Sequence, residues 1–464
     1  MTLIKSISGI RGTIGGKKGD NLSPEDVLLY TAAYAGWLKE NKASKKHKVV
    51  IGRDARLSGE MVANLVASAF MSLGIDVVDV GLSTTPTVEL AVPMEGADGG
   101  IIITASHNPA EWNALKLLNS KGEFLSADDG ARIIEIAENT GFNYAQVLDL
   151  GTRTYTDSYL ERHIGHILNI KQVDRNAIAG RKLKVVVDAV NSTGGIFVPE
   201  LLRKLGVEDI VEIYCEPSGM FPHNPEPLAK NLVELSKKVV ETSADLGIAV
   251  DPDVDRLVFV QEDGTLFGEE YTLVAVADYI LSSSPGNTVS NLSSTRALRD
   301  VTERHGGKYT ASAVGEVNVV EMMKQNKAVI GGEGNGGVIF PESHYGRDAL
   351  VGIALFLSHL CSWKDGRRRM SELKGSYPEY FMSKNKIELR EGMDVQGILD
   401  QLAQVYSSET INTVDGLKID FKEEWVHLRK SNTEPIIRIY SEAKSQERAD
   451  GIALELVNKI KSLI

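Results

Sequence analysis

Apolar and polar positions alternate along most of the chain in a pattern typical of α/β domains. Short apolar runs at residues 48–51, 75–80 and 101–103 are separated by longer segments with helical periodicity. One of these segments begins at Ser23 and Pro24, which suit an N-cap and a first helical position. Apolar runs between amphipathic helices are expected for strands covered by helices on both faces. The pattern therefore predicts an α/β domain over residues 1–150.

The same alternation starts again twice. It predicts a second α/β domain over residues 151–256 and a third over residues 257–373. The second includes predicted strands at 183–188 and 246–250, and a predicted helix over 228–242. From residue 374 to residue 464 the order changes to a helix, short strands and a closing helix. The predicted fold class is three tandem similar α/β domains plus a smaller C-terminal α+β domain.

Composition narrows the function classes. At 464 residues the chain is too long for one ordinary core, and it is 42% hydrophobic and 25% charged. We expect no signal peptide and no membrane span, because no apolar run approaches roughly 18 residues. The two cysteines, Cys215 and Cys361, lie far apart, which argues against a disulfide framework or zinc site and favours a cytoplasmic location. The formal net charge of −12 argues against a nucleic-acid partner. It leaves phosphorylated small molecules open, because these need only a few converging basic side chains.

Residues 104–109 (TASHNP) place a hydroxyl directly after the predicted strand at 101–103. Ligands of α/β sheets bind beyond the carboxyl ends of the strands, so Ser106 is a candidate nucleophile or phosphate carrier. The alternative is a turn in which serine and asparagine bond the local backbone. An esterase triad has little support, because Ser106 lies outside any GxSxG sequence.

Residues 251–256 (DPDVDR) follow the predicted strand at 246–250. Asp251, Asp253 and Asp255 would repel one another unless a cation lies among them, and oxygen ligands suit Mg²⁺. Arg256 could hold a phosphate oxygen beside the ion. The alternative is a solvated acidic turn.

Two further segments have the composition of binding loops. Residues 331–337 (GGEGNGG) offer Glu333 and Asn335 to vicinal sugar hydroxyls, with a flexible turn as the alternative. Residues 429–435 (RKSNTEP), with Arg438 beyond them, describe a phosphate pocket, with a charged hairpin end as the alternative. The candidate phosphate ligands there are Arg429, Ser431, Asn432, Thr433 and Arg438.

Taken together, the segments resemble the α-D-phosphohexomutase superfamily of phosphoglucomutases, phosphomannomutases and phosphoglucosamine mutases. The likeness covers the whole chain, and the motifs stand in the family's order. In that order they are similar to an arginine signature at 8–12 (SGIRG), the phosphoserine loop at 104–109, the metal loop at 251–256, the sugar-specificity loop at 333–337 and the phosphate loop at 429–435. Residues 219–227 (GMFPHNPEP) are similar to a further family segment.

The resemblance implies four domains around a central cleft, and it implies residue roles. Phosphorylated Ser106 would carry the transferable group and offer an oxygen to Mg²⁺ beside the three aspartates. Lys116 matches the family's general acid/base, Arg11 would lie close to the same phosphate, and His107 would help to position the serine. The substrate would be a phosphosugar, with a hexose 1,6-bisphosphate as intermediate and activator. A homodimer is compatible with the sequence.

The preferred sugar is a separate hypothesis. The GEGNGG sequence looks like an archaeal-type branch of the family, whereas Ser431-Asn432-Thr433 is similar to phosphomannomutases. In Val314-Gly315-Glu316, the acidic Glu316 could favour the ammonium group of glucosamine. We therefore expect a phosphoglucosamine mutase. The alternatives are a phosphoglucomutase/phosphomannomutase and, more remotely, a phosphosugar phosphatase or a non-catalytic sensor.

Overall fold

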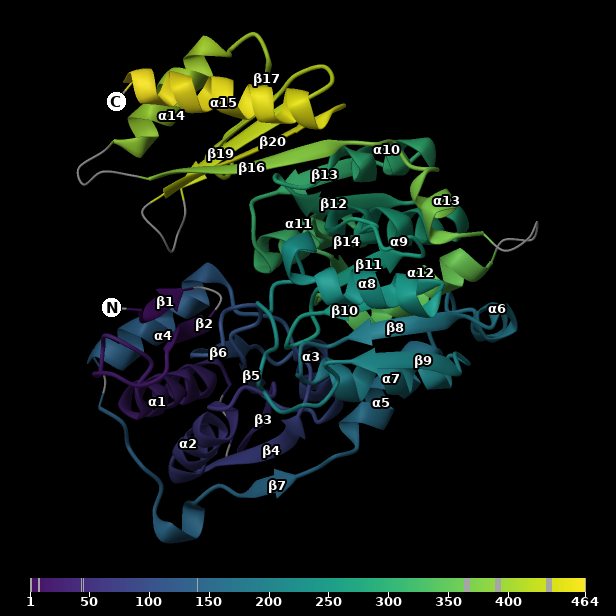
Figure 1. Cartoon of the computed structure of the whole chain (residues 1–464). Helices are drawn as coiled ribbons and strands as arrows, with labels where there is room; N and C mark the ends of the chain where they lie inside the picture. Colours follow the sequence, from purple (N-terminus) through teal and green to yellow (C-terminus); the bar gives the residue numbers. More distant parts are fainter. Residues whose placement is uncertain are drawn as a thin grey trace. The chain divides into compact units, whose positions relative to one another are not determined.

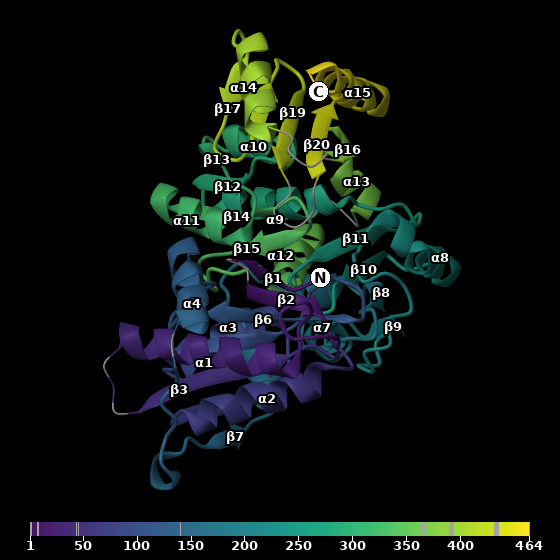
Figure 2. The same ribbon diagram turned by 90° about the vertical axis from the view of Figure 1, so that its left-hand side faces the viewer.

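The chain alternates helices and strands over the residues that the computed structural model describes (Figures 1 and 2). These are residues 2–6, 9–42, 44, 46–139, 141–362, 368–388, 394–430 and 436–463. Internal contacts divide the chain into two units. The first comprises Met1–Val276 and Asn335–Glu372, and the second comprises Ala277–Gly334 and Leu373–Ile464.

The first sheet of the first unit has the strand order β1-β2-β6-β5-β3-β4-β7. Strands β5, β3, β4 and β7 run parallel, while β1, β2 and β6 add antiparallel pairs at the other side. The strands are β1 (Ile4–Ser6), β2 (Gly9–Thr13), β3 (His47–Arg53), β4 (Ile75–Leu82), β5 (Gly99–Ile103), β6 (Trp112–Leu118) and β7 (Arg153–Tyr155). The helices are α1 (Pro24–Asn41), α2 (Gly59–Ser72), α3 (Thr85–Met94) and α4 (Ala127–Asn139).

Both faces of this sheet are covered by helices. Val49 and Ile51 of β3 belong to one core cluster with residues of α1, α2 and α4. Val50, between them, belongs to a second cluster with residues of α3. Successive side chains of a strand point to opposite faces, so the uninterrupted apolar run at 49–51 fits a sheet buried on both sides.

The second sheet of the first unit has the order β11-β10-β8-β9, with β10, β8 and β9 parallel and β11 antiparallel. The strands are β8 (Lys184–Asp188), β9 (Asp209–Ile213), β10 (Leu246–Val250) and β11 (Leu257–Gln261). The other elements are α5 (Tyr159–Leu168), α6 (Arg175–Arg181), α7 (Gly194–Lys204), α8 (Val233–Thr242), β15 (Gly337–Ile339), α12 (Ala349–Cys361) and the 3₁₀ turns η1 (Val147–Asp149) and η2 (Ala229–Asn231).

The single helix predicted over residues 228–242 is wrong in its first turn. The segment begins with η2 and continues as α8 only after Leu232, whose φ of −102° and ψ of 21° are not helical. Leu232 is buried in the core beside β10 and β11, and Asn231 donates to the Glu226 carbonyl at 2.7 Å. The burial of Leu232 and the hydrogen bond of Asn231 stabilise a separate 3₁₀ turn before α8 begins.

The second unit contains a parallel sheet and an antiparallel sheet. In the parallel sheet, β12 (Asn287–Asn291) lies between β13 (Tyr309–Ser312) and β14 (Ala328–Glu333), with α10 (Arg296–Arg304) and α11 (Glu316–Asn326). The antiparallel sheet has the order β16-β20-β19-β18-β17. Its elements are β16 (Phe381–Glu388), β17 (Thr410–Asn412), β18 (Leu417–Asp420), β19 (Trp425–Lys430), β20 (Ile436–Ala443), α14 (Val395–Val405) and α15 (Gln446–Leu463). The unit boundaries fall within α9 (Glu269–Ser283), between Gly334 and Asn335, and within α13 (Met370–Lys374). The predicted fold class, three α/β domains followed by an α+β domain, is confirmed.

A buried arginine ties the two sheets of the second unit together. Arg296 at the start of α10 is 5% exposed, and its Nη2 donates to Asp420 Oδ1 at 2.9 Å and to the carbonyls of Phe421 and Glu424 at 2.6 and 2.8 Å. Its backbone N–H donates to the buried Glu442 at 3.0 Å. These bonds from a buried guanidinium hold the β18–β19 turn against α10.

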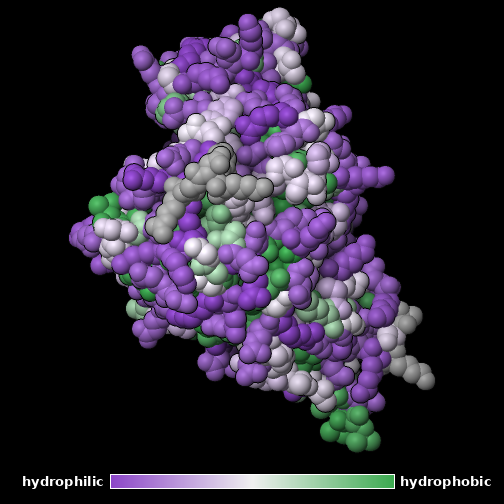
Figure 3. All heavy atoms as spheres, turned by 90° about the vertical axis from the view of Figure 1, so that its right-hand side faces the viewer, coloured by the Kyte–Doolittle hydropathy of each residue, from purple (hydrophilic) through white to green (hydrophobic). Residues whose placement is uncertain are grey.

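The surface is largely polar where it is seen. On the face shown in Figure 3, apolar side chains form small groups between hydrophilic ones. Within the described part of the chain, no helix combines the length and apolar character required to cross a membrane.

The N-terminus of α1 provides a first test. Ser23 accepts from the Asp26 N–H at 3.3 Å, and the Asp26 carboxylate accepts from the Ser23 N–H at 3.2 Å, so the two form a capping box. We expect Ser23→Ala to lower the free energy of unfolding by about 1 kcal/mol. Urea unfolding followed by circular dichroism would measure it. Ser72→Ala, which removes a hydroxyl bonded only to the Ala69 carbonyl, is the control; equal losses in the two variants would contradict the cap.

Candidate active site

Ser106 lies in a tight loop directly after β5. Its φ of 49° is in the left-handed region, which non-glycine residues seldom adopt. The Ser106 N–H donates to Thr104 Oγ1 at 2.9 Å, and the residue is 7% exposed. The loop therefore holds the serine in an uncommon backbone conformation, which is frequent at functional sites.

A buried arginine holds this loop in place. Arg56 is 1% exposed, and its guanidinium donates to the carbonyls of Pro109 and Trp112 at 2.7 and 3.0 Å. Those two bonds come from Nη1, and the second terminal nitrogen, Nη2, donates to the carbonyls of Ser106 and Asn108. Sequence reasoning missed Arg56.

Asp54 completes the scaffold below the loop. It is fully buried, accepts from Arg56 Nε at 3.0 Å, and accepts from Thr104 Oγ1 at 2.6 Å. Burial raises the pKa of Asp54, although the Arg56 charge acts in the opposite direction. The serine loop thus rests on a buried charge pair and on a threonine that also contacts the Ser106 backbone.

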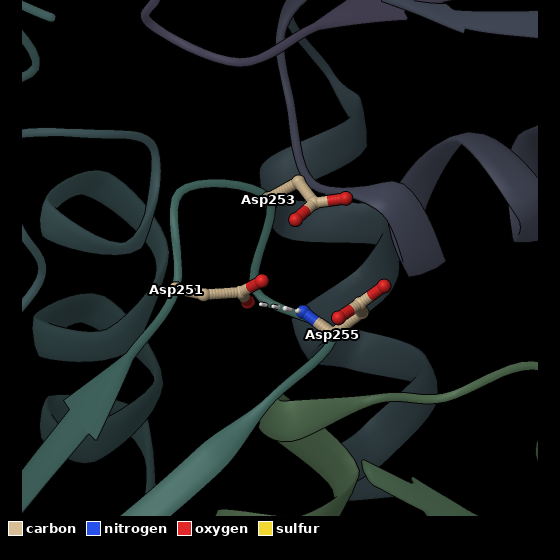
Figure 4. A group of neighbouring side chains, drawn as sticks. All are labelled: Asp251, Asp253 and Asp255. Carbon is tan, nitrogen blue, oxygen red and sulfur yellow. Dashed lines mark hydrogen bonds between the residues drawn. The ribbon is translucent and has the colours of Figure 1, made fainter. Parts of the chain in front are cut away.

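The three aspartates of residues 251–255 converge in the loop between β10 and β11 (Figure 4). All three are fully buried, and each offers a carboxylate oxygen within 4.8 Å of the others. Asp251 Oδ1 accepts from the N–H groups of Asp255 and Arg256, both at 3.1 Å. Val254 has a φ of 62°, which lets the loop turn back on itself.

The chemistry of this cluster fits a cation. Among the residues that the structure describes, no hydrogen-bond partner is found for the buried Oδ1 of Asp253 or the buried Oδ1 of Asp255. Burial raises the pKa of Asp251 well above its ordinary value, and the neighbouring Asp255 and Asp253 raise it further. Buried acceptors without donors are costly, and all-oxygen ligands suit a hard divalent ion. A search of the described residues for three or more acidic, histidine or cysteine side chains close enough to hold a metal ion finds these three aspartates.

Ser106 contacts the acidic cluster directly. Its Oγ donates to Asp251 Oδ2 at 2.7 Å, across 145 residues of sequence. His107 lies on the other side, with Nδ1 3.4 Å from Ser106 Oγ and Nε2 3.4 Å from Arg256 Nη2. Burial, together with the Arg256 charge, lowers the pKa of His107 well below its ordinary value. The imidazole is therefore neutral at pH 7.

Lys116 meets the same cluster from β6. Its Nζ lies 2.7 Å from Asp253 Oδ2 and 3.5 Å from Asp255 Oδ2. Burial acts to lower the pKa of Lys116, but the two carboxylates raise it overall. Thr85 at the start of α3, which sequence reasoning missed, donates to Asp253 Oδ2 at 2.5 Å. Two of the three aspartates thus hold the amine in place and favour its charged form.

Two other predicted arginines lie in the first unit. Arg256 is half-buried, and its Nη1 lies 3.3 Å from Glu226, which belongs to the 219–227 segment singled out in the sequence. Arg11 is half-buried on β2, where it pairs with Ala114 of β6. Ala114 is two residues before Lys116 on the same strand.

The predicted sugar-loop residues divide between the units. In the second unit, Glu333 ends β14 and accepts from Asn291 Nδ2 at 2.9 Å and from the Gly315 N–H at 3.1 Å. In the first unit, Asn335 is half-buried and accepts from the Gly337 N–H at 3.1 Å.

Arg429 and Arg438 face each other on neighbouring strands of the second unit. They are cross-strand partners on β19 and β20, and Lys386 of β16 pairs with Arg438. Arg429 lies 3.9 Å from Asp415, whose carboxylate also accepts from the Val314 N–H at 3.0 Å. The strands therefore bring three basic residues to adjacent positions. Ser8, Ser431, Asn432 and Thr433 lie outside the described residues.

The Arg56 scaffold generates a second test. We expect Arg56→Met to lower the free energy of unfolding by roughly 3–5 kcal/mol, because it leaves Asp54 buried without its charge partner. Thermal and urea unfolding would measure the loss. Arg132→Met removes an exposed arginine paired with the exposed Glu40 and is the matched control, with an expected loss of at most about 1 kcal/mol. A loss of similar size in both variants would contradict the scaffold role.

Comparison with known proteins agrees with this architecture. The models of the phosphoglucomutase/phosphomannomutase family match the chain as alpha/beta/alpha domain I over residues 3–144, domain II over 161–264, domain III over 268–380 and the C-terminal domain over 385–459. A crystal structure of a phosphoglucomutase/phosphomannomutase family protein from Burkholderia thailandensis superposes with a TM-score of 0.85 at 26% identity, covering 99% of this chain and 98% of the other.

Curated relatives extend over nearly the full length. A phosphoglucomutase/phosphomannomutase from Thermococcus kodakarensis is 38% identical over 444 residues, which cover 94% of this chain and 95% of that protein. A probable phosphoglucosamine mutase from Methanopyrus kandleri is 34% identical over 462 residues, which cover 98% of this chain and 97% of that protein. The chain therefore belongs to the phosphoglucomutase/phosphomannomutase family and is a phosphohexomutase, an enzyme of the isomerase class.

Proposed function

We propose that the enzyme interconverts hexose 6-phosphates and hexose 1-phosphates through phosphorylated Ser106 and a hexose 1,6-bisphosphate. The observation that carries this proposal is the 2.7 Å contact between Ser106 Oγ and Asp251 Oδ2. This contact supports a role for Ser106 as the phosphoryl carrier beside the acidic cluster, as does the binding of Lys116 to Asp253 and Asp255.

We assign the acidic cluster to Mg²⁺. Asp251, Asp253 and Asp255 would hold the ion, and the two carboxylate oxygens without hydrogen-bond partners support this assignment. When bound, Mg²⁺ would offset negative charge on the phosphoryl group. A phosphate oxygen on Ser106 would be a further ligand.

The transfer conserves phosphate and protons. The P–Oγ bond at Ser106 breaks, and a bond forms between phosphorus and the free hydroxyl oxygen of the hexose monophosphate. Lys116 gives a proton to Ser106 Oγ and recovers one from the sugar hydroxyl. Its contacts with Asp253 and Asp255 keep Lys116 protonated, so it has a proton to give. The bisphosphate then turns around, and its other phosphoryl group returns to Ser106 by the same steps.

The remaining roles follow the family resemblance. Neutral His107 would position Ser106, and Arg11 and Arg256 would bind the phosphoryl group near the serine. Glu333 and Asn335 would bind sugar hydroxyls. The phosphate that does not react would be held by Arg429, Ser431, Asn432, Thr433 and Arg438. The adjacent placement of Arg429 and Arg438 supports this assignment, because paired guanidinium groups suit a dianion.

We propose glucosamine phosphate as the preferred substrate. Glu316 is 8% exposed in the first turn of α11, directly after Gly315, whose N–H donates to Glu333. Two acidic residues in this part of the second unit would favour an ammonium group over a neutral hydroxyl. The second candidate is glucose or mannose phosphate, and the 38% identical relative named a phosphoglucomutase/phosphomannomutase favours it.

A coupled mutase assay tests the proposed reaction. With Mg²⁺ and catalytic hexose 1,6-bisphosphate, the enzyme should convert at least one of glucosamine, glucose and mannose 6-phosphate to its 1-phosphate. Ser106→Ala should lower kcat by at least about 10³-fold, because the phosphoryl carrier is lost. Ser72→Ala is the matched control. Release of inorganic phosphate in step with substrate loss would instead indicate a phosphatase, and no turnover of any of the three would indicate a sensor or another substrate.

Glu316 tests the sugar preference. We expect Glu316→Gln to lower kcat/KM for glucosamine 6-phosphate about 10-fold more than for glucose 6-phosphate, because only the former has an ammonium group. The ratio is the informative quantity, since an acidic residue in a first helical turn also stabilises the helix. Such a general effect would lower both rates together. An unchanged ratio would contradict the charge argument and favour the glucose/mannose alternative.

A further inference from the structure

A basic residue outside the recognised motifs contacts the acidic cluster. Arg347 Nη2 donates to Asp255 Oδ2 at 2.7 Å, and the arginine is only 9% exposed. The other oxygen of the same carboxylate, Oδ1, is buried and has no hydrogen-bond partner within the described part of the chain. Arg347 therefore engages one edge of Asp255 and leaves the other edge for a cation.

The side chain of Arg347 reaches Asp255 by passing over Gly337. A Cβ atom built on Gly337 would lie 2.3 Å from Arg347 Cδ and 3.0 Å from Arg347 Cγ. Because real Cβ atoms do not approach other heavy atoms so closely, any larger residue at position 337 would displace the arginine. The last glycine of the GEGNGG sequence thus makes room for an arginine, a role distinct from close approach of a ligand.

The backbone around Arg347 is fixed to the loop that carries the aspartates. The Leu257 N–H donates to the Gly336 carbonyl and the Ala349 N–H donates to the Val254 carbonyl, both at 3.2 Å. Arg347 also forms an antiparallel bridge with Ile339. Residues 336–349 are therefore hydrogen-bonded to the loop 254–257 on both sides of Asp255.

Asp348, the residue after Arg347, fixes this segment of the backbone through its own hydrogen bonds. Its Oδ1 caps α12 by accepting from the N–H groups of Leu350 and Val351, at 2.8 and 3.1 Å. Its Oδ2 lies 3.0 Å from His163 Nε2 and 3.2 Å from His344 Nε2. A carboxylate with four partners leaves the preceding residue little freedom, so the guanidinium approaches Asp255 from a fixed position.

We propose that Arg347, seated over Gly337, is a positioning residue that orients Asp255 for a divalent cation. The proposal rests on the magnesium site of the proposed function. A guanidinium near a cation is repelled by it, so its charge alone would weaken ion binding. The contribution lies instead in preorganisation, because an oriented carboxylate loses less freedom when the ion binds. Partners that orient metal ligands typically contribute about 10–100-fold in affinity.

Direct Mg²⁺ titration of the full chain tests this role independently of catalysis. Isothermal titration calorimetry would measure the Mg²⁺ dissociation constant of metal-free protein, with equal Ser106 phosphorylation in all samples verified by intact mass. We expect Arg347→Met to raise that constant about 10-fold or more. Arg347→Lys keeps the charge without the planar fork and should give an intermediate value. Arg153→Met, which removes an arginine paired with Asp79, is the matched control and should leave the constant unchanged.

Gly337→Ala separates the position of Arg347 from its charge. The added methyl group displaces the side chain but keeps the guanidinium, so we expect it also to weaken Mg²⁺ binding several-fold. Gly165→Ala on α5, where a Cβ meets no atom within 4 Å, is its control. Circular dichroism would verify folding of each variant, and Arg347→Lys and Gly337→Ala keep the test decisive if Arg347→Met does not fold.

The possible results of these titrations distinguish the proposal from its alternatives. Weaker Mg²⁺ binding in both Arg347→Met and Gly337→Ala, with unchanged controls, supports the proposal. Unchanged or tighter binding in Arg347→Met would overturn it, because the arginine would then only compete with the ion for Asp255. Weaker binding in Arg347→Met but not in Gly337→Ala would overturn the role assigned to Gly337. Absence of mutase activity with these Mg²⁺ effects intact would refute the proposed reaction alone.

Discussion

Three fully buried carboxylates within five residues are the constraint on which the first unit depends. Charges so close in a medium of low dielectric constant cannot all stay ionised without cations nearby. The fold supplies two of these cations from distant parts of the sequence, Lys116 at Asp253 and Arg347 at Asp255. Asp251 instead accepts from the hydroxyl of Ser106. The serine hydroxyl thus contacts the one carboxylate of the three for which no ion pair is found among the described residues, although the charge of the neighbouring Arg256 also acts on it.

A second buried charge pair performs the complementary task of holding the serine still. Arg56 donates to four carbonyls of residues 106–112, while Asp54 neutralises it and accepts from Thr104. An arginine suits this position because its planar donors diverge towards several acceptors at once. The left-handed conformation of Ser106 is therefore maintained by the scaffold beneath it.

Much of the fold and the local loops could be predicted from sequence, because strand ends are readable from apolar runs and ligands gather there. The strands at 48–51 and 246–250 and the contents of residues 251–256 needed only local pattern. Thr85, Arg56 and Arg347 could not be predicted in the same way. Thr85 and Arg347 lie far along the chain from the aspartates that they contact, and Arg56 lies far from the loop 106–112 that it holds. Each of these contacts depends on packing that no local pattern encodes. Arg347 belongs to none of the motifs recognised in the sequence. The related sequence feature is Gly337, and its role becomes clear only when the position of the Arg347 side chain is known.

The same limit applies to the hypothesis on the preferred sugar, for which two predicted loops gave different indications. Glu333 ends β14, yet its carboxylate accepts from Asn291 of β12 and from Gly315 before α11. Val314, next to Gly315, is in turn held by Asp415, which lies 3.9 Å from Arg429. The sugar-loop glutamate and a candidate phosphate arginine are therefore joined through one chain of contacts within the second unit. In such an arrangement the choice between sugars would depend on all of these contacts together. The sequence of one loop alone is therefore not sufficient to predict it.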